Sequence, residues 1–235
     1  LVFSLYSFTV NAQSLKVGLI DYPPHINFDE NLNKSPLYQY VNSILLPLSL
    51  QVEFIKLPRK RATIELRKGN IDLLLPASIS LENETKKRLS SSIFQSVSGL
   101  CFKKENFIPI LSATHRFDDL TIGLHIDSAV VSSLKNSKAK MVYISGKNAT
   151  ERGIEMTQKG RIDAFYHPSP INIYHRKNLL YKDIACSYFH GYSTPVYILV
   201  SNTLSTKKIE LIDKAFQDAM LKQTYEYYFA NRNNS

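Results

Sequence analysis

Arginine and serine side chains stand at positions where this chain could hold a small polar ligand. Arg88 offers a guanidinium group, whose planar fork matches a carboxylate with two parallel hydrogen bonds. The alternative is a solvated arginine at a helix end, because Arg88 closes the basic run 86–88. Ser78 follows the apolar run 73–75, and open α/β sheets bind ligands beyond the carboxyl ends of their strands. Its hydroxyl or a neighbouring N–H group is therefore a second donor for the same carboxylate.

Two more candidate positions follow predicted strands. Tyr22 comes after the apolar run 15–20 and before two prolines that force an extended loop. This setting favours an aromatic wall of a ligand site over a core position, and His25 and Phe28 in the same loop are further candidates. Residues 125–128 follow the apolar run 120–124 and are expected to open a helix, whose N-terminal N–H groups would attract an anion.

The sequence contains no recognisable catalytic signature. Gly-x-Ser-x-Gly, His-Glu-x-x-His and Cys–His motifs do not stand out, and the two cysteines define no metal site. We therefore predict no catalytic residues, no metal and no cofactor. A binding protein is the expected class, and an enzyme is the minority alternative.

A short phrase written twice indicates which elements position these residues. Residues 68–72 read Lys-Gly-Asn-Ile-Asp and residues 159–163 read Lys-Gly-Arg-Ile-Asp, each after a helix-like stretch and before an apolar run. Glycine supplies the left-handed residue that closes a helix, so each copy predicts a helix–Gly–strand joint. Two separated joints predict two similar α/β lobes with a ligand cleft between them.

The remaining periodicity extends this pattern along the chain. Ser35 and Pro36 predict a helix N-terminus, and a β-α-β-α-β order predicts a largely parallel sheet in the first lobe. The expected strands there are 15–20, 52–57 and 71–75, the expected second helix is 61–68, and the chain closes with a strand at 195–200 and an amphipathic helix.

The predicted lobes are discontinuous in sequence. The chain leaves the first lobe near residue 103 and returns near residue 192. Lobe 1 is then residues 13–103 plus 192–235, and lobe 2 is the inserted segment 104–191. Two crossing strands would act as the hinge.

The N-terminal run predicts export. Residues 1–10 carry no charge, are too short to span a bilayer, and lead into Val10-Asn11-Ala12, which is similar to a small-residue cleavage site. We expect residues 1–12 to be the remainder of a signal peptide, with a soluble periplasmic chain starting near Gln13. The alternative is a buried N-terminal strand.

The charge of the chain bears on a nucleic-acid partner, and its two cysteines bear on a disulfide. The formal charge of +9 is scattered along the chain without nucleic-acid-binding motifs, so we expect a solvated basic surface and no nucleic-acid partner. Cys101 and Cys186 allow one disulfide in an oxidising compartment, and two buried thiols are an equal alternative.

Several motifs together resemble the extracellular solute-binding proteins of family 3, which have the type II periplasmic binding protein fold. The motifs are residues 17–24, 57–62, 69–72, 85–88, 120–123 and 160–164, followed by the closing helix. The resemblance implies two α/β lobes, each a mostly parallel sheet flanked by helices, joined by a two-strand hinge. It also implies capture of a polar small molecule, usually an amino acid, for an ABC importer.

The resemblance also assigns roles to single residues. Arg88 follows Thr85 at the spacing of the family's carboxylate-binding arginine, and Ser128 matches a Ser/Thr at the family's lobe 2 turn. Arg61 resembles the arginine of a Pro-x-x-Arg-Ala motif in some relatives, and either faces the cleft or caps the lobe surface.

Two departures leave the ligand open. Asp127 stands where the family usually has glycine and would repel an anion. Amino-acid binders usually place an Asp after Gly-x-x-Asp-Ala, whereas Tyr166 and His167 stand here; both could line the cleft, but neither carries a permanent negative charge. Asp163 is expected to be structural.

The predicted function is capture of a small polar ligand, an amino acid or related carboxylate, in the interlobe cleft for ABC import. The predicted partners are this molecule and a membrane permease or receptor. A ligand-sensing module that docks to a membrane receptor is the alternative. A dehydratase-type enzyme comes last, since some relatives dehydrate cyclohexadienyl acids.

Overall fold

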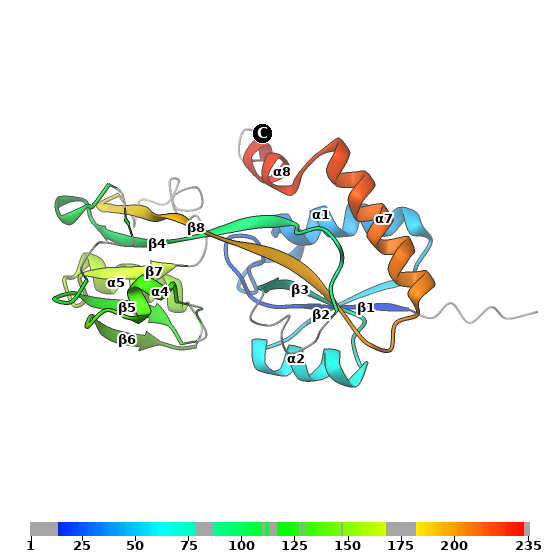
Figure 1. Ribbon diagram of the computed structural model, residues 1–235, viewed down its shortest axis with the longest axis horizontal. Coiled ribbons are helices and arrows are strands. Elements are labelled where there is room, and N and C mark those ends of the chain that lie inside the picture. Colours follow the sequence, from blue (N-terminus) through cyan, green and yellow to red (C-terminus); the bar gives the residue numbers. More distant parts are fainter. Residues whose placement is uncertain are drawn as a thin grey trace, which may run out of the picture.

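One continuous sheet runs through the computed structural model. The structure describes residues 14–78, 87–109, 111–112, 117–126, 128, 130–146, 148–167 and 182–232. Its eight strands lie in the order β2-β1-β3-β8-β4-β7-β5-β6. Figure 1 shows two bodies of helices and strands, joined by the long strands β4 (Phe94–Lys103) and β8 (Ile184–Val200).

The first body contains both ends of the described chain. Its strands β1 (Leu15–Leu19), β2 (Val52–Lys56) and β3 (Leu73–Ser78) are parallel. The helices of this body are α1 (Pro36–Leu45), α2 (Arg59–Lys68), α7 (Thr206–Lys222) and α8 (Tyr225–Arg232). Short 3₁₀ turns at Leu32–Lys34 and Leu46–Leu48 flank α1.

Alternation along β3 explains why helices cover both faces of this sheet. Leu73 and Leu75 pack in the core cluster that also contains apolar residues of α1, α7 and α8. Leu74 points to the opposite face and packs with Ala62 and Leu66 of α2. Figure 1 accordingly shows α2 below the sheet and the other three helices above it.

The second body repeats this design. Its strands are β5 (Thr121–His125), β6 (Lys140–Ile144) and β7 (Ala164–His167), again parallel. The helices of this body among the described residues are α4 (Ser132–Lys135) and α5 (Ala149–Gln158), and a 3₁₀ turn at Lys104–Asn106 ends β4. Leu134 of α4 and Ile154 of α5 belong to different core clusters, so this sheet too is covered on both faces.

The two copies of the repeated phrase form equivalent joints, as predicted. Gly69 and Gly160 have φ angles of 75° and 67°, and each follows a helix and precedes a strand. Asp72 Oδ2 accepts a hydrogen bond from the backbone N–H of Lys16 at 2.8 Å, and Asp163 Oδ2 accepts one from Thr121 N–H at 2.7 Å. The expected structural role of Asp163 is confirmed by this contact.

The crossing strands approach closely where their pairing is irregular. The register of β4 against β8 shifts between Val97 and Gly99. A Cβ atom on Gly99 would lie 2.3 Å from the carbonyl oxygen of Ser187, so this crossing requires glycine.

A disulfide also joins these strands. Cys101 and Cys186 pair directly across β4 and β8, with Cα atoms 3.9 Å apart. Of the two alternatives that the sequence left open, the structure has the disulfide.

The predicted two-lobed α/β class is confirmed, with three local corrections. Helix α2 begins at Arg59, two residues earlier than predicted, because Pro58 before it already has the extended geometry of an N-cap position. Strand β3 runs through Ser78, since Ala77 and Ser78 still pair with β8. Ser128 does not open a helix: its N–H donates to the carbonyl of His125, and α4 begins only at Ser132.

Other predictions are not decided by the described residues. Residues 1–13, and with them the predicted signal peptide, lie outside the described ranges, as do Thr85 and Asp127. The lobe boundaries at 103 and 192 stay a prediction, because β4 and β8 run through both bodies without a break at those residues. Among the described residues, no helix has the length and hydrophobicity needed to cross a membrane.

Candidate ligand-binding site

A cavity of about 440 Å³ lies where the two bodies face each other. The first body contributes the loop 20–29 after β1 and the segment 56–59 between β2 and α2. The second contributes the end of β5, the start of α5 and the end of β7, and both crossing strands add residues. The cavity thus sits at the carboxyl ends of parallel strands from both bodies, where open α/β sheets place ligands.

Four of the seven predicted site residues line this cavity. They are Tyr22 from the first body and Ser128, Tyr166 and His167 from the second. The structure therefore brings together aromatic and polar residues separated by more than a hundred positions in sequence. Ser128 does so from a turn, in which its N–H donates to the carbonyl of His125 at 2.9 Å.

Arg61 and Arg88 are not in the cavity lining, and the side chain of Ser78 lies outside what the structure describes. Arg61 is exposed on α2, where its Nε lies 3.5 Å from Glu65 Oε1. Ser78 lies in β3, paired with Val196 of β8. The Arg88 guanidinium lies 4.0 Å from the ring centroid of Tyr197 and donates to the backbone carbonyl groups of Leu89 and Ser90.

Two tyrosines and two serines form a floor for the cavity. The hydroxyl groups of Tyr22 and Ser96 are 2.8 Å apart, and a hydrogen bond joins Tyr166 to Ser98. The serines lie two residues apart on the crossing strand β4, so they share one face of it. Burial raises the pKa of Tyr22 to about 12, so its hydroxyl stays protonated at physiological pH.

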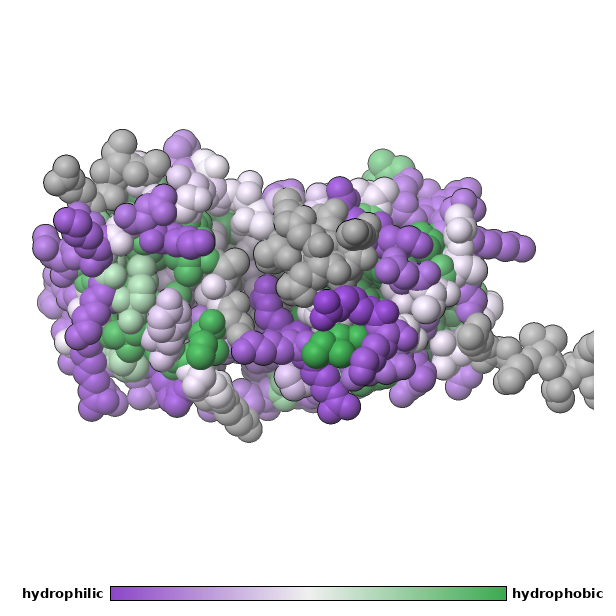
Figure 2. All heavy atoms as spheres, turned by 60° about the horizontal axis from the view of Figure 1, so that its bottom comes forward, coloured by the Kyte–Doolittle hydropathy of each residue, from purple (hydrophilic) through white to green (hydrophobic). Residues whose placement is uncertain are grey.

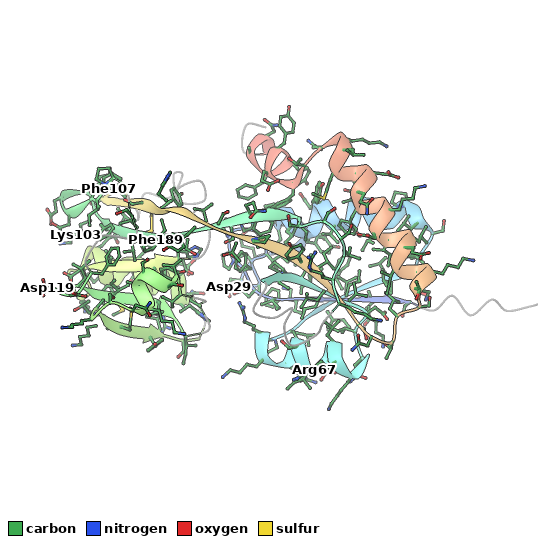
Figure 3. The ribbon with its side chains drawn as sticks, viewed as in Figure 1. Asp29, Arg67, Lys103, Phe107, Asp119 and Phe189 are labelled. Atoms are coloured by element: carbon green, nitrogen blue, oxygen red, sulfur yellow. A yellow bond between two sulfur atoms is a disulfide. The ribbon has the colours of Figure 1, made fainter. Side chains whose placement is uncertain are left out.

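The cavity also collects charged residues that we did not predict. Lys56 and Arg59 are the cations, and Asp21, Asp29 and Glu151 are the carboxylates. Figure 3 shows Asp29 on the side of the first body that faces the second. Charges of both signs thus face a ligand, with one more carboxylate than cation among the described residues.

Arg59 and Glu151 are notable because neither side chain has a partner in the part of the chain that the structure describes. Arg59 is the first residue of α2, and Glu151 lies in the first turn of α5. Among the residues that the structure describes, neither charged group forms a hydrogen bond or an ion pair. Both are half-buried, and they belong to opposite bodies.

Asp21 couples electrostatically to both sides of the cavity. Burial raises the pKa of its carboxyl, and the nearby charges of Asp29 and Glu151 raise it further. A hydrogen bond of 2.9 Å from Phe28 N–H to Asp21 Oδ1 opposes this shift. Since Glu151 comes from the second body, like charges face each other across the cavity.

Lys56 is partly engaged within its own body. Its Nζ lies 5.2 Å from the ring centroid of Phe28 and 3.4 Å from the Phe28 carbonyl oxygen. It therefore helps to hold the aromatic wall of the cavity. Within the described ranges, no cluster of three or more His, Cys, Asp or Glu side chains could hold a metal ion.

A sequence signal for Arg59 and Glu151 did exist. Both stand at the start of a helix that follows a parallel strand, the position at which ligands meet such sheets. We applied this rule to Ser78 and to residues 125–128 but not to Arg59 or Glu151. Among the described residues, the carboxylates that line the cavity are Asp21 and Asp29 after β1 and Glu151 in the first turn of α5.

Comparison with solved structures identifies the fold. The ancestral cationic amino acid solute-binding protein AncCDT-1 matches with a TM-score of 0.72 at 18% identity, over 93% of this chain and 94% of its own. The GluR0 ligand-binding core in complex with L-glutamate matches with a TM-score of 0.74 at 14% identity, over 93% and 97% of the two chains.

A third structure is a transporter component. The amino acid ABC transporter substrate-binding protein AbpA from Streptococcus pneumoniae, bound to L-arginine, has a TM-score of 0.71 at 15% identity, over 93% of each chain. No protein-family model matches the sequence, and no curated protein sequence matches it. The chain therefore has the two-lobed periplasmic binding protein fold, as the resemblance implied.

Proposed function

We propose that the chain binds a small zwitterionic ligand, an amino acid or a close relative, between its two bodies. The observation that carries the proposal is the pair of unpartnered charges, Arg59 and Glu151, on opposite sides of one cavity. A guanidinium matches a ligand carboxylate and a carboxylate matches a ligand ammonium. A zwitterion that contacts both groups stabilises the closed arrangement of the two bodies.

The charge balance favours a cationic ligand side chain over an acidic one. Asp21 and Asp29 add negative charge beyond the Arg59–Glu151 pair, and the aromatic faces of Tyr22 and Phe28 attract cations. Similar folds bind L-arginine in AbpA and are described as cationic amino acid binders in AncCDT-1. We therefore expect L-arginine or L-lysine to bind more tightly than L-glutamate.

Substitution of three arginines tests which one holds the ligand carboxylate. Arg59→Ala should raise the Kd for the ligand at least about tenfold, because a charge-assisted hydrogen bond in a half-buried cavity is lost. Arg61→Ala, on the same helix but outside the cavity, is the matched control and should leave the Kd unchanged. Arg88→Ala tests the assignment that the sequence favoured.

The measurement combines a thermal-shift screen of L-amino acids and small organic acids with calorimetric titration of each variant. A ligand that binds only the folded state raises the Tm with its concentration. Absence of any hit with well-folded protein contradicts the proposal. A hit that survives Arg59→Ala and is lost in Arg88→Ala returns the carboxylate site to Arg88.

Delivery to an ABC importer outside the cytoplasmic membrane is the role we propose for this binding. Support comes from the uncharged N-terminal run and from neighbours that serve ABC transporters. A sensor that docks to a membrane receptor uses the same cleft, so uptake of labelled ligand in cells with and without the gene separates the two roles.

An enzyme is a second candidate, since AncCDT-1 is also described as a precursor of cyclohexadienyl dehydratase. Recovery of the bound ligand chemically unchanged after prolonged incubation would support binding alone. Conversion of the ligand would instead support catalysis in the same cavity.

A further inference from the structure

The C-terminal helix α8 packs against the back of the loop that lines the cavity. Residues 22, 23 and 27–29 of this loop face the cavity, whereas His25 points the other way and is 4% exposed. The His25 ring lies between the rings of Phe94 and Phe229, with centroid distances of 4.5 Å and 5.0 Å. The loop is thus built on an aromatic cluster that α8 completes.

One hydrogen bond fixes His25 to this helix. The Tyr225 hydroxyl lies 2.7 Å from His25 Nδ1, and Tyr225 itself is 1% exposed. Burial lowers the pKa of His25 to about 3, so the ring is neutral at physiological pH and this bond joins two neutral groups. The ring of His25 also stacks on Tyr22, at a centroid distance of 5.7 Å, which connects Tyr225 to the cavity wall in two steps.

The same helix also holds the crossing strand at the base of the cavity. The Tyr225 ring packs against Phe94, with centroids 5.2 Å apart, and Glu226 Oε1 accepts a hydrogen bond from the N–H of Gln95 at 3.2 Å. Helix α8 therefore contacts the two elements that position Tyr22, namely its own loop and the strand that carries Ser96.

We propose that Tyr225 is a positioning residue for ligand binding: through His25 it holds the loop 22–29 in the shape that lines the cavity. The inference rests on the proposed function, because the loop matters only if the cavity takes a ligand. A loop that leaves this shape part of the time lowers the fraction of binding-competent protein, and the apparent Kd rises by the inverse of that fraction.

Two Tyr→Phe variants separate positioning from general stability. Tyr225→Phe keeps the ring and removes only the hydroxyl that meets His25. Tyr40→Phe is the matched control: the Tyr40 hydroxyl donates to the carbonyl of Gln223 at 2.7 Å, and Gln223 caps α7 just before α8 and is not part of the loop. Both variants lose one tyrosine hydrogen bond to the C-terminal segment, and both should lower the Tm.

Two readouts are measured on each variant of the whole chain. The first is the Kd for the tightest binder among L-arginine, L-lysine, L-glutamine and L-glutamate. We expect a rise of about fivefold or more in Tyr225→Phe and less than about twofold in Tyr40→Phe. The second is amide hydrogen exchange of the peptide containing residues 22–28 without ligand, which should become faster only in Tyr225→Phe.

Equal Kd values for wild type and Tyr225→Phe would overturn the inference, as would equal Kd increases in the two variants. Failure of all four amino acids to bind the wild type would count against the proposed function instead. The exchange measurement then still decides whether Tyr225 holds the loop, and unchanged exchange in Tyr225→Phe would refute that link.

Discussion

At the scale of single residues, the charge of Asp21 in the cavity lowers the stability of the ligand-free protein. Desolvation at the cavity and the nearby charges of Asp29 and Glu151 raise the pKa of the Asp21 carboxyl above its ordinary value of 3.8. The folded protein therefore binds this proton more tightly than the unfolded chain does. Stability falls as the pH rises through the interval between the two pKa values, and the loss is complete at neutral pH.

Asp21→Asn should therefore stabilise the ligand-free protein while weakening the binding of a cationic ligand. The amide oxygen can still accept the bond from Phe28 N–H, so we expect the Tm to rise by about 2 °C at pH 7. This gain should vanish below about pH 4, where the wild-type carboxyl is protonated in both states. Thermal unfolding from pH 3 to pH 8, with titration of L-arginine, measures both effects.

Glu155→Gln serves as the control for removal of a negative charge. Glu155 lies one turn beyond Glu151 on α5 but pairs with Lys159, with 3.3 Å between Lys159 Nζ and Glu155 Oε2. Glu155→Gln should change the Tm and the affinity for L-arginine only slightly, because exposed ion pairs contribute little to stability. A Tm of Asp21→Asn below that of wild type at pH 7 would contradict the electrostatic account.

The site could be predicted only where local sequence determines which way a side chain points. The position of Tyr22 in the cavity lining was predictable, because the end of a strand precedes it and two prolines follow it. Arg88 was not, because its choice between the cavity and the face of Tyr197 depends on how distant strands pack. Arg59 and Glu151 become a pair only in three dimensions, since nothing in the sequence joins the start of α2 to the start of α5.

At the scale of elements, the repeated phrase turned out to encode a whole packing unit. Ile71 fills the space beside Gly18, and Ile162 fills the equivalent space beside Gly123. A Cβ atom on either glycine would lie 2.5 Å from the Cδ1 atom of its isoleucine. Helix, glycine, isoleucine and aspartate thus recur with the same contacts in both bodies. The strand order and helix positions were predictable for this reason, whereas the ends of α2 and β3 shifted with tertiary pairing.

Substitution of the two helix-ending glycines should show how far this equivalence extends. Gly69→Ala forces a side chain into a left-handed residue, and its Cβ would also lie 2.7 Å from Thr203. Gly160→Ala meets only the backbone strain, since its nearest neighbour, Lys103 Nζ, is 3.8 Å away. We expect losses of about 2 kcal/mol and about 1 kcal/mol in the free energy of unfolding, measured by urea denaturation. Equal losses in the two variants would show that Thr203 moves aside without lowering the free energy of unfolding.

At the scale of the whole molecule, the disulfide closes a loop that contains most of the second body. Cys101 and Cys186 are 85 residues apart in sequence, and β5, β6 and β7 all lie between them. The bond therefore restricts the unfolded chain of this body far more than that of the first. Figure 2 shows hydrophobic residues in patches among hydrophilic ones on the face turned toward the viewer.

Removal of both cysteines should destabilise the second body selectively. For Cys101→Ala with Cys186→Ala, chain entropy predicts a loss of about 4.6 kcal/mol for a loop of 85 residues. Scanning calorimetry should then show the second body unfolding first, with a separate transition close to the wild-type Tm for the first body. A single transition shifted as a whole would mean that the continuous sheet keeps the two bodies cooperative.

The cavity is bounded by two kinds of surface. One is the crossing strand near the irregular pairing at Val97 and Gly99, and the other is the pair of facing edges that carry Arg59 and Glu151. The register shift between β4 and β8 lies beside Ser96 and Ser98, the serines that bond to Tyr22 and Tyr166, whereas Arg59 and Glu151 stand on the separate bodies on either side. Under the proposed function, we expect a ligand that enters between the two bodies to meet the tyrosine and serine hydroxyl groups first and Arg59 and Glu151 afterwards. Selection would then act in two successive stages, by shape and hydrogen bonding on arrival and by charge on enclosure. A molecule that satisfies only the first stage would leave before the second is complete.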